Sequence, residues 1–260
     1  MFARHAWILA LVRTALKAAL ARPWASALGA LLMAMNNLTF FMVWWVLMAA
    51  VGHIKGWQLP EIAVLSGFGS MSFGLAFLLA GGALDISRTL RDGGLDVHLA
   101  HPKSPLVCLV LRHADPECVG DIASGIIVLS VFGGVTVGQG LGIAGLALLA
   151  ACVWLSITII IHSLAFWLKG QRTTQQVFDS FVVSSTFPVH AMPLWIKTVL
   201  LTVFPVGFIS LVPVDIIRNF AGWKLAVMVM ATAVLAFLAV YIFHRGLRRY
   251  TSGSQMTEVR

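Results

Sequence analysis

The residues from Leu141 to Leu168 read LGIAGLALLAACVWLSITIIIHSLAFWL, and this stretch decides the fold class. It contains no Asp, Glu, Lys or Arg over its whole length. A helix needs about 20 consecutive apolar residues to cross a hydrocarbon core of about 30 Å. The stretch therefore predicts a membrane-spanning helix, and it sets the standard for the rest of the chain.

The composition of the whole chain agrees with this local pattern. Of the 260 residues, 59% are apolar and 11% are charged, and the mean hydropathy is +0.92. A soluble protein of this length would carry charge on about a quarter of its positions. The composition predicts a polytopic integral membrane protein, all-α, with no soluble domain of useful size. The net charge of +8 is spread in small groups between apolar segments, which is typical of topology signals and not of nucleic-acid binding.

Further apolar segments predict six spans in a single transmembrane domain. We expect the fifth to be a span followed by re-entrant helices, because Pro188, Pro193, Pro205 and Pro213 interrupt it. A charged loop at 85–105 separates the second span from the third. The six expected spans are 26–52, 62–84, 119–137, 141–168, 177–213 and 223–243.

Residues 3–22 alternate basic and apolar positions at helical spacing. This pattern predicts an amphipathic helix that rests in the headgroup region, bound to membrane lipid by apolar burial and by attraction to anionic headgroups. The alternative is a solvated basic leader. No signal-peptide cleavage pattern is evident, so we expect the N-terminus to be retained.

The distribution of basic residues predicts the orientation. In the six-span topology, fourteen of the 18 Lys and Arg residues lie on the side that holds both termini. The other four are Lys55, Lys197, Arg218 and Lys224. Because cytoplasmic loops are enriched in Lys and Arg, both termini are expected in the cytoplasm and the loop from His53 to Glu61 outside.

Motifs for catalysis, cofactors or metals do not emerge from the sequence. There is no GxxxxGK[ST] loop, so ATP cannot bind by that route. His98 and His101 lack an HExxH context, and Ser184 and Ser185 near His190 lack a GxSxG turn. The three cysteines, Cys108, Cys118 and Cys152, form no CxxC pair and are expected to serve packing.

Ionisable residues inside the expected spans are few. His162, Asp121 and Asp179 all lie within a turn or two of the predicted cytoplasmic boundary. Snorkelling or helix capping is the favoured interpretation for all three. A proton-driven carrier is disfavoured by their scarcity.

Short motifs in this layout resemble those of ABC-2 type transporter permeases. The family has a cytoplasmic stretch of the form G-x-L-D followed by L-x-x-P after its second span. Residues 82–85, GALD, resemble its beginning, and residues 94–102, GLDVHLAHP, resemble the full form, with His101 in the place of the usual Arg. A second likeness lies in the proline motifs of residues 187–188, 192–195, 204–209 and 212–213.

The resemblance implies a permease subunit of an ABC-type exporter in a bacterial inner membrane. Such a chain is driven by a separate ABC ATPase, present in two copies, and pairs with a second permease chain of the same or a homologous kind. The 85–105 loop would act as a coupling helix that docks the ATPase through Asp85, Arg88, Leu90, Arg91, Leu95, Asp96 and Leu99. An ordinary solvated loop is the alternative for this segment. For the whole chain, the alternatives are a membrane-embedded lipid-modifying enzyme and a non-catalytic membrane scaffold.

Overall fold

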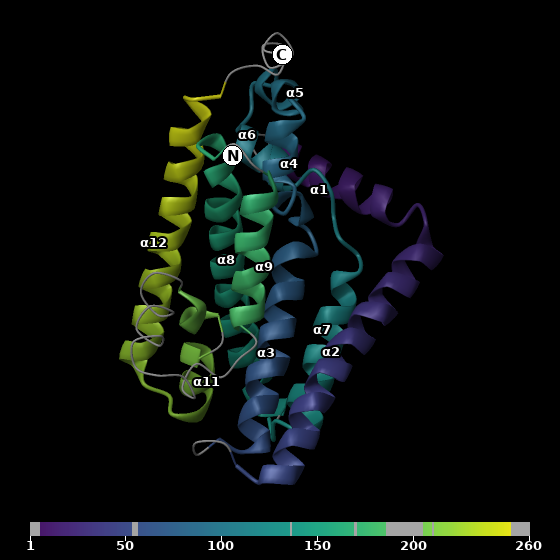
Figure 1. Ribbon diagram of the computed structural model, residues 1–260, viewed down its shortest axis with the longest axis vertical. Helices are drawn as coiled ribbons and strands as arrows, with labels where there is room; N and C mark the ends of the chain where they lie inside the picture. Colours follow the sequence, from purple (N-terminus) through teal and green to yellow (C-terminus); the bar gives the residue numbers. More distant parts are fainter. Residues whose placement is uncertain are drawn as a thin grey trace.

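The computed structural model describes residues 6–53, 57–135, 137–168, 171–185, 205–209 and 211–250, and its elements are helical (Figure 1). The longer helices are α1 (Ala6–Ala19), α2 (Pro23–Val51), α3 (Leu59–Phe77), α7 (Cys118–Val131), α8 (Gly140–Ser163), α9 (Gln171–Ser185), α11 (Leu211–Arg218) and α12 (Gly222–Leu247). The short ones are η2 (Gly81–Ala83), α4 (Ile86–Arg91), α5 (Leu95–Leu99), α6 (Pro105–Val110), η3 (Val137–Gln139), η4 (Leu164–Phe166) and η6 (Val206–Phe208).

Four of the described helices are long and apolar enough to cross a membrane. They are α2, α3, α8 together with η4, and α12. The apolar helix α7 has 14 residues and rises about 21 Å, so it is shorter than the hydrocarbon core. The all-helical, membrane-spanning class is therefore confirmed, whereas the count of six spans stays a prediction.

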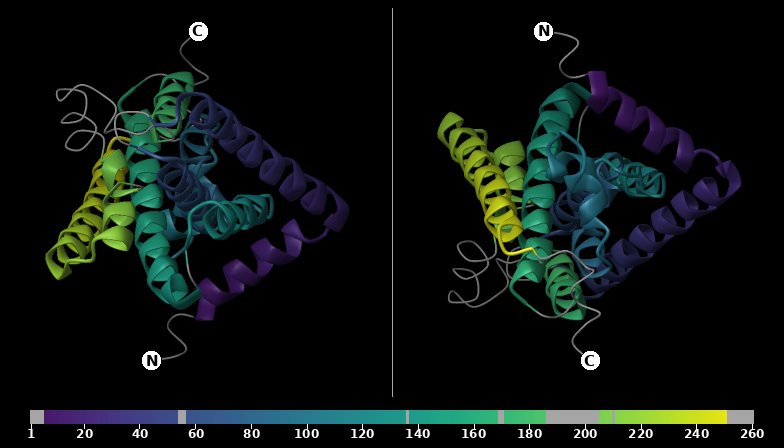
Figure 2. Two further views of the ribbon diagram at one scale, coloured as in Figure 1. Left: turned by 90° about the horizontal axis from the view of Figure 1, so that it is seen from below. Right: turned by 90° about the horizontal axis from the view of Figure 1, so that it is seen from above.

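Two of the long helices lie inside the bundle and two lie outside it. Over their most apolar windows, α3 and α8 are 56% and 61% buried, whereas α2 and α12 are 11% and 17% buried. Figure 2 shows α12 packed outside α8 on one side, with α2 on the opposite side beyond α3 and α7. The apolar outer faces of α2 and α12 are thus free to contact lipid or another chain.

Small residues allow the helices to approach closely at the centre of the bundle. Gly67 and Gly74 of α3 lie against the backbone of α7, and Gly120 of α7 lies against the backbone of α2 at Ala30. In lipid there is little hydrophobic drive for helices to associate, so close packing of this kind supplies much of the stability. It explains how the short helix α7 is held between α2 and α3.

The short helices η2, α4, α5 and α6 gather at one end of the bundle and are called the end platform here (Figure 1). The helix α1 and the last turn of α12 lie at the same end, and α11, the end of α2 and the start of α3 lie at the other (Figure 1). The second span was expected to run to Leu84, but α3 ends at Phe77 and η2 follows. Gly82 explains the break, because its backbone packs directly against the carbonyl oxygens of Leu109 and Val110 in α6.

The expected fifth segment, 177–213, differs from the structure where the two can be compared. Its first helix, α9, begins at Gln171 and is mainly polar. The expected re-entrant region includes residues 186–204 and 210, which lie outside the described residues. After them, Pro205 precedes the turn η6, and Pro213 lies in the first turn of α11, where a missing backbone N–H costs no helical hydrogen bond.

Candidate coupling surface and membrane cavities

The end platform has a buried side that fastens it to the membrane-spanning helices. Ile86, Leu90 and Leu95 are buried in a core that also contains Trp154 and Ile161 of α8. The short helix α4 contacts α8, α9 and η4. The platform is therefore part of the same packed unit as the spans.

Two polar contacts fix the orientation of α4. Arg112, which precedes α7, donates to the Asp85 carboxylate at 2.6 Å and to the Thr89 hydroxyl at 2.7 Å. Ser87 Oγ lies 2.9 Å from His162 Nδ1 near the end of α8, and both side chains are buried. These contacts connect α4 to α8 on one side and to the segment before α7 on the other. A shift of α4 would therefore move α8 or that segment.

The seven residues predicted to dock an ATPase divide into two groups. The sequence suggested that Leu90 and Leu95 offer an apolar surface to a partner. They are 7% and 0% exposed, so neither can do so. Asp85 is half-buried and paired with Arg112. These three residues hold the platform together because the chain folds their side chains against its own core.

The remaining predicted residues face outward. Arg88 and Arg91 are exposed on α4, and Arg91 pairs with the neighbouring Asp92 at 3.0 Å. Leu99 is 41% exposed on α5, and Val97, which the sequence also offered as apolar surface, is 66% exposed. Asp96 is half-buried. Burial of Tyr250, just beyond α12, and the nearby Asp96 carboxylate raise the pKa of Tyr250 to about 12.

Ionisable groups around the platform respond to burial and to Arg112. Burial lowers the pKa of His98, and the positive charges of Arg112 and His101 lower it further. Burial raises the pKa of Asp115, which His113 partly offsets. His98 is thus favoured in its neutral form, so it adds no positive charge to the exposed face at neutral pH.

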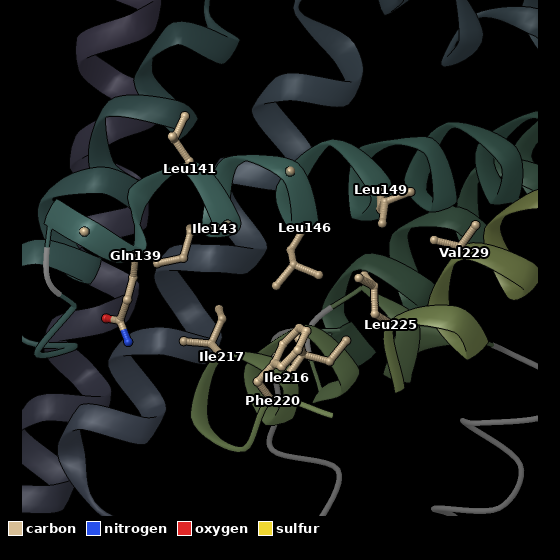
Figure 3. A pocket seen from close by; sticks show the side chains of 13 residues that line it. Gln139, Leu141, Ile143, Leu146, Leu149, Ile216, Ile217, Phe220, Leu225 and Val229 are labelled. Carbon is tan, nitrogen blue, oxygen red and sulfur yellow. The ribbon is translucent and has the colours of Figure 1, made fainter. Parts of the chain in front are cut away.

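A cavity of about 620 Å³ lies at the opposite end of the bundle, between α8, α11 and α12 (Figure 3). Figure 3 shows Leu146 of α8, Ile216 of α11 and Leu225 of α12 around this space. Its lining is almost entirely aliphatic and aromatic. Gln139 is the polar side chain of this lining, and the aliphatic and aromatic remainder suits acyl chains or other apolar groups.

A second cavity, of about 320 Å³, has a mixed lining. Polar residues come from α2 (Asn36, Asn37), α3 (Ser66, Ser70), α7 (Asp121) and α9 (Ser185). The Asn37 amide donates to Asp121 Oδ1 at 2.7 Å and also lies 3.1 Å from Ser124 Oγ. In this cavity a carboxylate, that of Asp121, lines a hollow between the helices.

The sequence interpretation missed the second cavity. Asp121 and His162 were expected to snorkel or to cap helices, but they are 3% and 0% exposed and their hydrogen bonds go to other elements. Of the three ionisable residues, Asp179 is exposed, and it accepts a hydrogen bond from Gln175. The available signal was Asn36-Asn37 in the middle of an apolar helix, a polar pair that needs a partner in lipid.

Comparison with known families decides the identity of the chain. A model described as an ABC-2 family transporter protein matches residues 34–254. This range covers three of the four candidate spanning helices completely and α2 from residue 34 onward. The chain belongs to the ABC-2 transporter family. The suspected resemblance is therefore confirmed at the level of the family. No curated protein and no solved structure matches the chain.

Membership in this family makes the chain a membrane transport protein. The matched range includes the end platform, the first cavity and the lining of the second cavity except Met33. The helix α1 and the first turns of α2 precede the matched range.

Proposed function

We propose that this ABC-2 family protein is the permease subunit of an ABC-type exporter, and that a separate ATPase drives it through the exposed side of the end platform. The observation that carries the proposal is the two-sided construction of α4 and α5. One side is buried in the core of the spanning helices, and the other presents Arg88, Arg91, Asp92, Val97 and Leu99. A coupling element needs both sides.

The exposed side combines charge with apolar area. Guanidinium and carboxylate groups give a docked partner its orientation, and exposed Val97 and Leu99 give it apolar contact. The buried side supplies the mechanical connection, since Ser87 contacts His162 in α8 and α4 packs on α9. A displacement of the platform by ATP binding would therefore move α8 and α9.

The charge distribution supports a cytoplasmic platform. The exposed Arg13 and Lys17 of α1, Arg88 and Arg91 of α4, and the basic residues that end α12 gather at the platform end. At the other end, Arg218 pairs with Glu61, and Lys224 lies 2.7 Å from Asp215. Basic residues thus concentrate on one side, as expected for the cytoplasm.

The apolar outer faces of α2 and α12 support a second permease chain as a further partner. The inner helices α3 and α8 are largely buried within the single bundle. Two chains that meet along an outer face would enclose more space. We propose a pair of permeases, the same or homologous, with two ATPase chains on the platform side.

The test is co-expression of this chain with the ABC ATPase encoded beside its gene, followed by purification in detergent. The wild-type chain should recover the ATPase and its ATP hydrolysis. The double variant Arg88→Glu with Arg91→Glu should insert normally, because both residues lie outside the core, but should lose most of the bound ATPase.

The matched control is Arg248→Glu with Arg249→Glu, which makes the same change of charge at two exposed residues at the end of α12. This variant should retain the ATPase. Equal recovery of the ATPase by the wild type and the Arg88/Arg91 variant would show that the platform is not the coupling element.

A further inference from the structure

The carboxylate of Asp121 is incompletely satisfied where it lies. The side chain is 3% exposed, and Asn37 satisfies Oδ1 whereas Oδ2 has no hydrogen-bond partner among the described residues. The ion pairs of the described residues all lie elsewhere. An ionised carboxylate inside the membrane region requires a cation or a strong donor to balance it.

The cavity beside Asp121 supplies the space for such a group. Its volume of about 320 Å³ is within the range of small-molecule pockets. Trp154 of α8 also lines this cavity, and its Nε1 donor is likewise buried without a partner among the described residues. Two residues of the cavity wall therefore each carry one unpartnered polar atom, and a ligand that reaches Asp121 Oδ2 and Trp154 Nε1 would satisfy both.

Aromatic rings line the same space and favour a positive charge. Phe40 and Phe73 join Trp154 in the lining, and the rings of Phe73 and Trp154 meet edge to face at 5.2 Å. The faces of such rings attract cations, most strongly where water is excluded. Met33, Leu65 and Val182 complete the wall and can accept an apolar body.

We propose that this cavity binds the ammonium group of an amphipathic amine, which pairs with Asp121 while the apolar body contacts the aromatic and aliphatic wall. An ammonium group balances the ionised form of this carboxyl group, and an anion would be repelled by it. The Trp154 indole donates to a hydroxyl or carbonyl oxygen near the amine. As a statement about the cargo, the inference rests on the proposed export function.

The test is equilibrium binding of radiolabelled octylamine to the full chain in phosphatidylcholine nanodiscs, with empty nanodiscs subtracted. Unlabelled octylamine should displace the label, and octan-1-ol and octanoate, which match its length without the ammonium group, should not. Asp121→Asn should weaken octylamine binding by about tenfold or more. Asp179→Asn, the same change at an exposed carboxylate of α9 that does not line the cavity, should leave the binding unchanged.

A second variant keeps the inference testable if Asp121→Asn fails to fold. Gly69 lines the cavity and has open space where a side chain would stand. Gly69→Leu should fill the cavity and abolish octylamine binding while Asp121 is retained. Gly145→Leu, which points into the apolar cavity between α8 and α12, is its control and should bind octylamine as the wild type does.

Changing the lipid of the nanodiscs shows whether the amine that occupies the site is a lipid headgroup or a free amine. If replacing half of the phosphatidylcholine by phosphatidylethanolamine weakens octylamine binding, the headgroup of that lipid occupies the site. Unchanged binding assigns the site to a free amine. The inference would be overturned if octan-1-ol displaced the labelled octylamine as effectively as unlabelled octylamine does. It would also be overturned if Asp121→Asn and Gly69→Leu both folded and both bound octylamine as fully as the wild type.

Binding is measured without an ATPase, so the two proposals can fail separately. A chain that binds octylamine through Asp121 but never recruits an ATPase would keep the amine site and refute the exporter. A chain that recruits its ATPase but does not distinguish octylamine from octan-1-ol would keep the exporter and refute the amine site.

Discussion

Arg112 determines how the end platform is held at the residue scale. Its guanidinium reaches both the Asp85 carboxylate and the Thr89 hydroxyl, and the Arg112 and Asp85 side chains are each 30% exposed. A partly buried guanidinium that donates to two acceptors, one of them a carboxylate, contributes more than an exposed ion pair. The sequence named Asp85 as a residue for docking, but its partner within the chain could not be identified because the two are far apart along the sequence.

We expect Arg112→Gln to destabilise the protein by about 1–3 kcal/mol, since Asp85 would keep its burial and lose its main donor. Thermal unfolding of the purified chain in detergent should show a lower midpoint. Arg91→Gln, which breaks only the exposed pair with Asp92, should leave the midpoint nearly unchanged. Equal midpoints for wild type and Arg112→Gln would argue against this role.

Asp115 gives the platform end a pH-dependent stability. Burial raises the pKa of its carboxyl above the ordinary value of 3.8, so the folded protein favours the protonated form more than the unfolded chain does. A raised pKa contributes stability that is fully present below the unfolded value and is lost as the pH rises through the folded value. Asp115→Asn should therefore be more stable than the wild type near pH 7, and the difference should shrink toward pH 4 in thermal unfolding experiments. A difference that grows toward pH 4 would have the wrong sign.

At the scale of elements, the contact between η2 and α6 sets the geometry of the platform. Gly82 allows the two backbones to touch, and the buried leucines of α4 and α5 then complete the core. Long apolar runs predicted the all-helical, membrane-spanning class, because a spanning helix is specified by composition over many residues. They could not predict where α3 ends, nor that Leu90 and Leu95 face inward, because short helices carry too few residues to reveal a buried side.

We predict that Gly82→Ala will destabilise the chain by about 1–3 kcal/mol or prevent its recovery from membranes, since the new Cβ would overlap the Leu109 carbonyl oxygen. The control is Gly145→Ala in α8, where a Cβ meets open space and the substitution should be neutral or stabilising by about 0.5–1 kcal/mol. Unfolding midpoints of the two variants give the comparison. Similar midpoints would mean that the backbone contact at Gly82 is dispensable.

At the scale of the whole molecule, the protein consists of inner helices that pack tightly and outer helices that expose apolar faces. The inner pair, α3 and α8, connects the platform to both cavities, and the outer pair, α2 and α12, is available to lipid and to a second chain. The fold class and the family could be predicted from the sequence because both depend on long segments. The cavity at Asp121 could not, because it is built from residues of α2, α3, α7, α8 and α9 that meet only in three dimensions.

The most direct test of the central claim, that an ATPase docks on the exposed side of α4 and α5, is site-specific photocrosslinking in intact cells. A benzoylphenylalanine introduced at Val97, which is 66% exposed on α5, should form a covalent adduct with the ABC ATPase encoded beside the gene. The same group at Phe220, which is 74% exposed and follows α11, should form none. An adduct from Phe220 but not from Val97, or none from Val97 when the ATPase co-purifies with the chain, would contradict the account.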